Sequence, residues 1–144
     1  MDNKIDLILQ GPYTTFTDTL IESYLNLSFI NNIIIACWET DPKDNIIDSR
    51  VKYVRSPEYK SYPGPTNVNL QLTTSLAGVR SSDSKYIAKF RSDQQYTLDS
   101  ISKMYEYFIN NFDSEKIYIC GDLYEYLFHP RDWVYWGSKE SMIK

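Results

Sequence analysis

The sequence predicts an α/β protein with a three-layer arrangement, in which helices cover both faces of a mostly parallel sheet. Short apolar segments rich in β-branched residues recur along the chain, and segments with apolar residues at helical spacing separate them. Each apolar segment ends in a stretch that is polar or contains glycine or proline. Strands and helices that alternate in this way form right-handed crossovers, which give a parallel sheet.

Length and composition set the size of the protein and exclude several classes. The 144 residues are expected to form one domain, 1–144, and 42% hydrophobic residues suffice for a packed core. The 15 Lys and Arg against 19 Asp and Glu give a formal net charge of −4. Because basic residues do not cluster, binding to a nucleic-acid duplex is not expected. A single bound nucleotide is compatible with this charge.

Membrane insertion and secretion are not indicated. The apolar stretch Phe29–Trp38 is interrupted by Asn31 and Asn32 and is shorter than the ~20 residues of a membrane span. The first residues do not resemble a signal peptide. We therefore expect a cytoplasmic protein, free or at a membrane surface. Cys37 and Cys120 stand in apolar runs and are expected to be core residues rather than a disulfide or zinc pair.

The first predicted strand is Ile5–Leu9, an apolar run that Gln10-Gly11-Pro12 ends. The following segment has the apolar spacing of a helix, at Leu20, Ile21, Tyr24, Leu25 and Leu27. Thr19 and Glu22 have the spacing of a capping box and place the start of the helix near them. The sequence thus begins with a strand and then a helix.

Two more strands are predicted before the next helix. Ile33–Cys37 is apolar throughout, as expected for a strand covered on both faces, and Glu39–Pro42 ends it. Val51–Arg55 is a shorter candidate, and a proline-rich loop follows at Ser56–Pro65.

The second predicted helix has two distinct faces. Its apolar face is formed by Val68, Leu72, Leu76 and Val79, and its polar face by Asn67, Gln71 and Thr74. The polar side chains would bind sugar hydroxyls or a nucleobase if they line a ligand crevice, or they face solvent. Tyr86–Phe90 is the fourth strand.

The last part of the chain contains one more helix and strand. The helix is marked by Ile101, Met104, Tyr105, Phe108 and Phe112, and the strand is Lys116–Cys120. The segment His129–Gly137 is dense in Trp and Tyr and has no clear period.

Ligands of parallel α/β sheets bind at the carboxyl ends of the strands. The segments in question are Gln10–Tyr13, Trp38–Asp41, Ser56–Pro65 and Arg91–Gln95. Asp93 directly follows the fourth strand, and a carboxylate there can bind Mg²⁺ or Mn²⁺ together with diphosphate oxygens. The alternative is a solvated carboxylate at a strand end.

The turn Gln10-Gly11-Pro12 has neither the G-x-G-x-x-G nor the P-loop pattern, so dinucleotide cofactors and P-loop NTPase activity are not favoured. Gly11 would allow the backbone to approach a base or ribose closely, or it forms a plain tight turn.

The aromatic segment contains the single histidine of the chain. His129 can act as a base or metal ligand, and Arg131 can pair with phosphate. Trp133 and Trp136 can stack on a sugar or fill an edge of the core, in which case Arg131 and Asp132 pair at the surface. No Ser-His-Asp or Cys-His arrangement can be argued from one histidine.

Five segments in order resemble the WavE lipopolysaccharide-synthesis family of glycosyltransferases. They are Ile5–Pro12, Ile33–Glu39, Gly64–Gln71, Lys89–Gln94 and Phe128–Asp132. The resemblance implies a GT-A-like fold, a nucleotide-sugar donor, and a glycan or lipid-linked acceptor. Since GT-A domains generally have a longer chain, 1–144 is expected to be a minimal enzyme, a fragment shortened on the acceptor side, or a degenerate binding domain.

The resemblance also implies roles for individual residues. GT-A enzymes carry an Asp-x-Asp motif after the fourth strand. Arg91-Ser92-Asp93 stands in its place, so Asp93 matches the carboxylate that binds Mn²⁺ or Mg²⁺. Arg91 replaces the first aspartate and would itself neutralise the diphosphate.

Other implied contacts surround the donor. The nucleotide would be bordered by Gln10, Gly11, Pro12, Trp38 and Glu39, the donor pocket lined by Asn67, Asn69 and Gln71, and the reacting sugar approached by His129, Arg131 and Asp132. Asp132 or His129 would deprotonate the acceptor hydroxyl.

The leading hypothesis is a glycosyltransferase that uses a nucleoside-diphosphate sugar for surface polysaccharide or glycan synthesis. The alternative is a non-catalytic module that binds a nucleotide sugar or carbohydrate. A nucleotidyltransferase would bring a glycine-rich, basic loop after the first strand, which is missing. Exposed Tyr and Trp side chains would also suit a homodimer interface.

Overall fold

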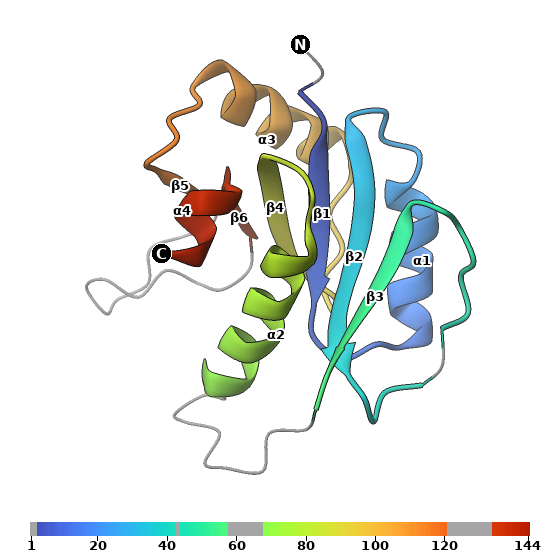
Figure 1. The fold of residues 1–144 in the computed structure, drawn as a ribbon. Coiled ribbons are helices and arrows are strands. Elements are labelled where there is room, and N and C mark those ends of the chain that lie inside the picture. Colours follow the sequence, from blue (N-terminus) through green and yellow to red (C-terminus); the bar gives the residue numbers. More distant parts are fainter. Residues whose placement is uncertain (1–2, 43, 58–67, 121–133) are drawn as a thin grey trace, which may run out of the picture.

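A computed structural model describes residues 3–42, 44–57, 68–120 and 134–144. Its elements, shown in Figure 1, are β1 (Ile5–Gln10), α1 (Thr15–Tyr24), β2 (Ile30–Trp38), β3 (Val51–Ser56), α2 (Val68–Ser81), β4 (Tyr86–Arg91), α3 (Leu98–Asn110), β5 (Ile117–Cys120), β6 (Val134–Ser138) and α4 (Lys139–Ile143).

The six described strands form one sheet in the order β3-β2-β1-β4-β6-β5. Strands β1 to β4 are parallel, and β6 is antiparallel to both of its neighbours. One face packs against α1 and α3, the other against α2 and α4 (Figure 1). The expected three-layer, mostly parallel α/β fold is therefore confirmed.

The chain changes direction between β1 and β4. From β1 it adds β2 and β3 on one side, and α2 then carries it across to β4 on the other side of β1. Since α1 and α2 cover opposite faces (Figure 1), the carboxyl ends of β1 and β4 form the topological switch point of the sheet. Ligand crevices of open α/β sheets lie at such points.

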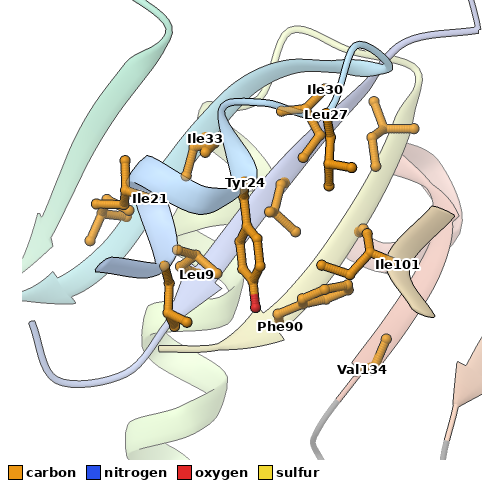
Figure 2. Packing of buried hydrophobic residues seen from close by; sticks show 14 of the residues in the cluster. Leu9, Ile21, Tyr24, Leu27, Ile30, Ile33, Phe90, Ile101 and Val134 are labelled. Atoms are coloured by element: carbon orange, nitrogen blue, oxygen red, sulfur yellow. The ribbon is translucent and has the colours of Figure 1, made fainter. Parts of the chain in front are cut away.

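The larger core lies on the α1 and α3 face. Figure 2 shows Tyr24 of α1 pointing toward Phe90 of β4, and their rings meet edge to face at 6.2 Å. The Tyr24 hydroxyl accepts a hydrogen bond at 3.1 Å from the backbone N–H of Tyr96. The core thus fixes the segment that follows β4.

The first helix begins one turn earlier than the sequence predicts. Its N-cap is Thr14, whose backbone N–H donates to the Thr17 hydroxyl at 3.1 Å. Thr19 lies inside the helix. The prediction with Thr19 and Glu22 was wrong because Thr14 and Thr17 offer an equivalent capping pair at the same spacing.

The second helix turns a different face to the sheet than its leucines suggest. Leu72, predicted in the apolar face, is 55% exposed, whereas Thr74 and Gly78 are buried. A Cβ on Gly78 would lie 2.7 Å from Cγ2 of Ile8 and 3.0 Å from Cβ of Ala36. The helix approaches the strands most closely at Gly78, which has no side chain, and Val79 of the predicted apolar face is buried as expected.

The end of the chain contains a strand that periodicity does not reveal. Val134–Ser138 forms β6, which fills the position between β4 and β5. Trp136 is 1% exposed and packs on Phe90 and Phe108, so it is a core residue and not a sugar-stacking surface. Cys37 is also buried, as expected.

Candidate functional site

The ends of β1 and β4 are joined directly at the switch point. The Ser92 N–H donates to the Gln10 carbonyl at 2.9 Å, and the Ser92 hydroxyl donates to the Pro12 carbonyl at 2.9 Å. Gly11 has a φ of +131°, and a Cβ there would lie 2.6 Å from the Ser92 Oγ. Glycine is therefore required, and the close approach it permits is to Ser92 of the neighbouring turn.

Gln10 ends β1 with a buried amide. Its Nε2 donates to the Thr74 hydroxyl of α2 at 3.0 Å, and Thr74 is fully buried rather than part of a solvent-facing stripe. The Oε1 atom of Gln10 is buried and has no hydrogen-bond partner among the described residues. An unsatisfied buried oxygen is costly, so this position favours an incoming donor group.

Arg91 and Asp93 form a bidentate ion pair at the end of β4. The Arg91 Nε lies 2.8 Å from Oδ1 of Asp93, and its Nη2 lies 2.6 Å from Oδ2. This guanidinium, helped by the charge of Lys89, holds the pKa of Asp93 below its ordinary value, although burial opposes it. The Asp93 side chain is 52% exposed, so the pair is open to solvent at the sheet edge.

This geometry bears on the predicted metal. Both oxygens of Asp93 are engaged by Arg91, and within the described ranges no group of three or more His, Cys, Asp or Glu residues could hold a metal ion. One carboxylate that is already paired with a guanidinium is a poor donor set for Mg²⁺ or Mn²⁺. Cation binding at Asp93 stays a prediction.

Lys89 is the residue here that sequence reasoning missed. It lies on β4 two residues before Arg91 and is 3% exposed. Its Nζ stands over the Tyr135 ring of β6, 5.3 Å from the centroid. A single charged residue inside the apolar run Tyr86–Phe90 was the available signal, because lysine is almost never fully buried unless it is paired.

The loop after β2 lies at the same edge of the sheet. The carboxylate of Asp41 accepts the N–H groups of Trp38 at 2.9 Å and of Tyr13 at 3.2 Å, and so ties the ends of β1 and β2 together. Arg55 of β3 donates to the Trp38 carbonyl at 2.9 Å. Asp41 and Arg55 position this loop, and neither was predicted from the sequence.

Several residues predicted to contact the nucleotide-sugar donor lie among the described residues, and their role stays a prediction. Trp38 is half-buried and Glu39 exposed at the end of β2, while Pro12 is exposed in the turn after β1. Asn69 and Gln71 are half-buried in the first turns of α2. The remaining predicted site residues, Asn67, His129, Arg131 and Asp132, lie outside the described residues.

Comparison with known proteins adds a fold relationship. No family model matches the chain, and no curated protein matches it. Among solved structures, the chain is similar to the 4-diphosphocytidyl-2C-methyl-D-erythritol synthase of Anaerococcus prevotii DSM 20548. The TM-score is 0.62 at 10% identity, over 99% of this chain and 73% of that one.

The chain has a GT-A-like α/β fold. The likeness extends to the fold alone, because the sequences share 10% of their residues. Resemblance to the WavE family stays a prediction. In the described part of the structure, none of the helices combines the length and apolar character needed to cross a membrane.

Proposed function

We propose that the protein is a glycosyltransferase that uses a nucleoside-diphosphate sugar to build a surface polysaccharide or another glycan. The observation that carries this proposal is the position of the Arg91–Asp93 pair. It lies at the carboxyl end of β4, beside the Gln10–Pro12 turn of β1, at the switch point of a GT-A-like fold.

The chemistry requires positive charge where the diphosphate leaves. Either a divalent cation on Asp93 or the guanidinium of Arg91 would stabilise that developing charge. Gln10 and Gly11 would border the nucleotide. Asp132 or His129 would take the proton from the acceptor hydroxyl, a role that follows from the resemblance.

Nucleotidyl transfer is the second candidate. The similar solved structure is named as a synthase of a diphosphocytidyl compound. A nucleoside triphosphate needs cations near the turn after β1, but this chain has neither Lys nor Arg anywhere in Ile5–Pro42. This distribution of basic residues therefore favours a diphosphate donor that is bound at the end of β4.

The released product distinguishes the candidates. Purified protein is incubated with UDP-, GDP-, CDP- and dTDP-sugars and a panel of sugar acceptors, and in parallel with the corresponding nucleoside triphosphates and a panel of sugar phosphates, each with and without Mn²⁺. Release of nucleoside diphosphate supports glycosyl transfer, and release of pyrophosphate from a nucleoside triphosphate supports the second candidate. Saturable binding without product in any condition would identify a non-catalytic binding module.

Asp93→Ala tests the site itself. If the ion pair orders the diphosphate site, this variant loses about 100-fold in kcat/KM while its unfolding free energy changes little. Asp99→Ala is the matched control, because Asp99 forms a comparable exposed pair with Lys103 at the start of α3. Equal activity of the two variants would show that Asp93 is not part of the site.

A further inference from the structure

We propose that Asp41 is a positioning residue of the donor site, whose carboxylate holds the turn after β1 (residues 11–13, the β1 turn) and the loop after β2 (residues 38–42, the β2 loop) in a fixed arrangement before the donor binds. The inference rests on the proposed function. It adds a residue that acts through the backbone of two neighbouring segments and needs no contact with the donor itself.

Strand β2 continues past the level at which β1 and β4 end. Gln10, the last residue of β1, has Arg91 as its register partner in β4 and Ala36 as its partner in β2. Trp38 ends β2 two residues after Ala36, and at about 3.3 Å per residue this adds roughly 7 Å. The β2 loop therefore lies beside the β1 turn, on the side away from β4, and borders the switch point where a donor would bind.

A single oxygen of Asp41 joins the two segments. Its Oδ2 accepts the backbone N–H of Trp38 in the β2 loop at 2.9 Å and the backbone N–H of Tyr13 in the β1 turn at 3.2 Å. The Asp41 N–H donates in turn to the Trp38 carbonyl at 3.2 Å. Hydrogen bonds from backbone N–H groups to a carboxylate are charge-assisted and stronger than those to a neutral acceptor. The carboxylate therefore fixes the β1 turn relative to the β2 loop.

The Tyr13 side chain makes a second connection between the same parts of the chain. The residue is 1% exposed, and its ring packs edge to face on Tyr53 of β3 at 5.6 Å. Its hydroxyl donates to Oδ1 of Asp18 in α1 and accepts the backbone N–H of Asn45 at 3.1 Å. The Asn45 Nδ2 donates to the other oxygen of Asp18 at 3.0 Å. Tyr13 is thus held through its hydroxyl and, by Asp41, through its backbone.

Arg55 of β3 holds the β2 loop from its other side. The guanidinium donates to three backbone carbonyls, those of Trp38 at 2.9 Å, Asp41 at 3.3 Å and Pro42 at 2.6 Å. It also pairs with the carboxylate of Asp44. A loop whose backbone groups are bonded in this way loses little conformational freedom when a ligand binds beside it, and this increases the affinity for the ligand.

Calorimetric titration with UDP, GDP, CDP and dTDP, with and without Mn²⁺, tests the inference. For the diphosphate that wild type binds most tightly, the Kd of Asp41→Ala should rise about 10-fold, because two N–H groups lose their acceptor and the loop must be ordered on binding. Asp41→Asn should stay within about 3-fold of wild type, because one oxygen accepts both N–H groups and asparagine keeps one. Equal losses in both variants would show that the charge of Asp41 acts directly, which overturns the inference.

Asp48→Ala is the matched control. The Asp48 carboxylate also accepts a backbone N–H, that of Arg50 at 2.8 Å, but it precedes β3 at the amino end of the sheet. This variant loses the same kind of bond away from the switch point, so its Kd should stay at the wild-type value. Equal Kd values for Asp41→Ala and Asp48→Ala would overturn the inference and leave the proposed function intact. Absence of diphosphate binding by wild type would overturn both.

Amide hydrogen exchange gives a second measurement, made on the unmodified protein, that does not depend on the folding of Asp41→Ala. In free wild type, the N–H groups of Tyr13 and Trp38 should exchange at least about 100-fold more slowly than in an unfolded chain, because Asp41 already accepts both. Asp41→Asn should show the same protection. If both amides are unprotected in the free protein and become protected only when the diphosphate is added, the ligand and not Asp41 orders these segments, and the inference is wrong.

Discussion

On the face of the sheet that α2 covers, the two ends of β1 differ in how far their buried polar groups are hydrogen-bonded. At the amino end, Asp6 of β1 is fully buried and its oxygens accept four hydrogen bonds. These come from the side chains of Asn31, Asn32 and Ser82 and from the backbone N–H of Asp83. At the carboxyl end, Gln10 of the same strand leaves one oxygen without a described partner.

The difference shows where the buried polar groups are satisfied by the protein itself. A carboxylate with all its acceptor capacity used fixes β1, β2 and the end of α2 relative to one another, which is a structural role. At the carboxyl end, the buried oxygen of Gln10 is unsatisfied, which is an arrangement that a ligand would complete under the proposed function. Substitutions at the amino end should therefore affect stability, and those at the carboxyl end should also affect diphosphate binding.

Asp6→Asn is expected to have the largest effect. An amide group in place of one oxygen would direct N–H donors at groups that are themselves donors, and the free energy of unfolding should fall by about 3 kcal/mol. Urea unfolding measures it. Asp83→Asn is the control, because Asp83 is an 82% exposed partner of Lys52 and should change stability by less than about 0.5 kcal/mol. Similar losses in both variants would refute the contrast between a buried and an exposed carboxylate.

Acid titration sharpens the same comparison. Burial raises the pKa of Asp6, but hydrogen bonds from Ser82, Ser84 and the two asparagines outweigh it and hold the pKa below its ordinary value of 3.8. A carboxyl with a lower pKa in the folded state stabilises the fold above pH 3.8, and this contribution is lost as the pH falls through the folded value. The stability difference between wild type and Asp6→Asn should therefore shrink below pH 3.8. A constant difference would contradict this assignment.

Gly11→Ala comes next, at the carboxyl end. A Cβ at a φ of +131° and 2.6 Å from the Ser92 Oγ should cost about 2 kcal/mol and weaken diphosphate binding, because the turn must shift. Urea unfolding and calorimetry measure the two effects. In a Ser92→Ala background the contact is relieved but the backbone strain remains. The double variant should therefore lose less stability than the sum of the losses in Gly11→Ala and Ser92→Ala. If the two losses of stability simply add, the contact with Ser92 is not what requires glycine at position 11.

Thr74→Val is expected to have the smallest effect. It keeps the shape of the side chain but removes the acceptor of the Gln10 Nε2, and should cost about 1 kcal/mol and a few-fold in diphosphate affinity. Thr73→Val is the control, because the Thr73 hydroxyl donates within its own helix, to the Asn69 carbonyl at 2.8 Å. If both variants bind diphosphate equally, Gln10 is not positioned through Thr74.

Some of the candidate site could be predicted from the sequence and some could not. The position of Asp93 after β4 and the need for glycine at position 11 follow from local patterns, a strand end and a tight turn. The contact between Gln10 and Thr74 joins residues 64 positions apart, and only the packing of α2 on β1 creates it. Lys89 lies in an apolar run typical of a strand, and the sequence pattern does not show which neighbouring strand or helix buries its side chain.

The sequence by itself determined the alternation of strands and helices and hence the parallel part of the sheet, because hydrophobic periodicity is a local property of each segment. Only the tertiary structure decided which face of α2 meets the sheet, and that β6 enters antiparallel between β4 and β5. Both depend on close packing and on pairing between distant segments. The placement of Lys89, Arg91 and Gln10 at one switch point has the same origin, since the strands that carry them become neighbours only in the folded chain.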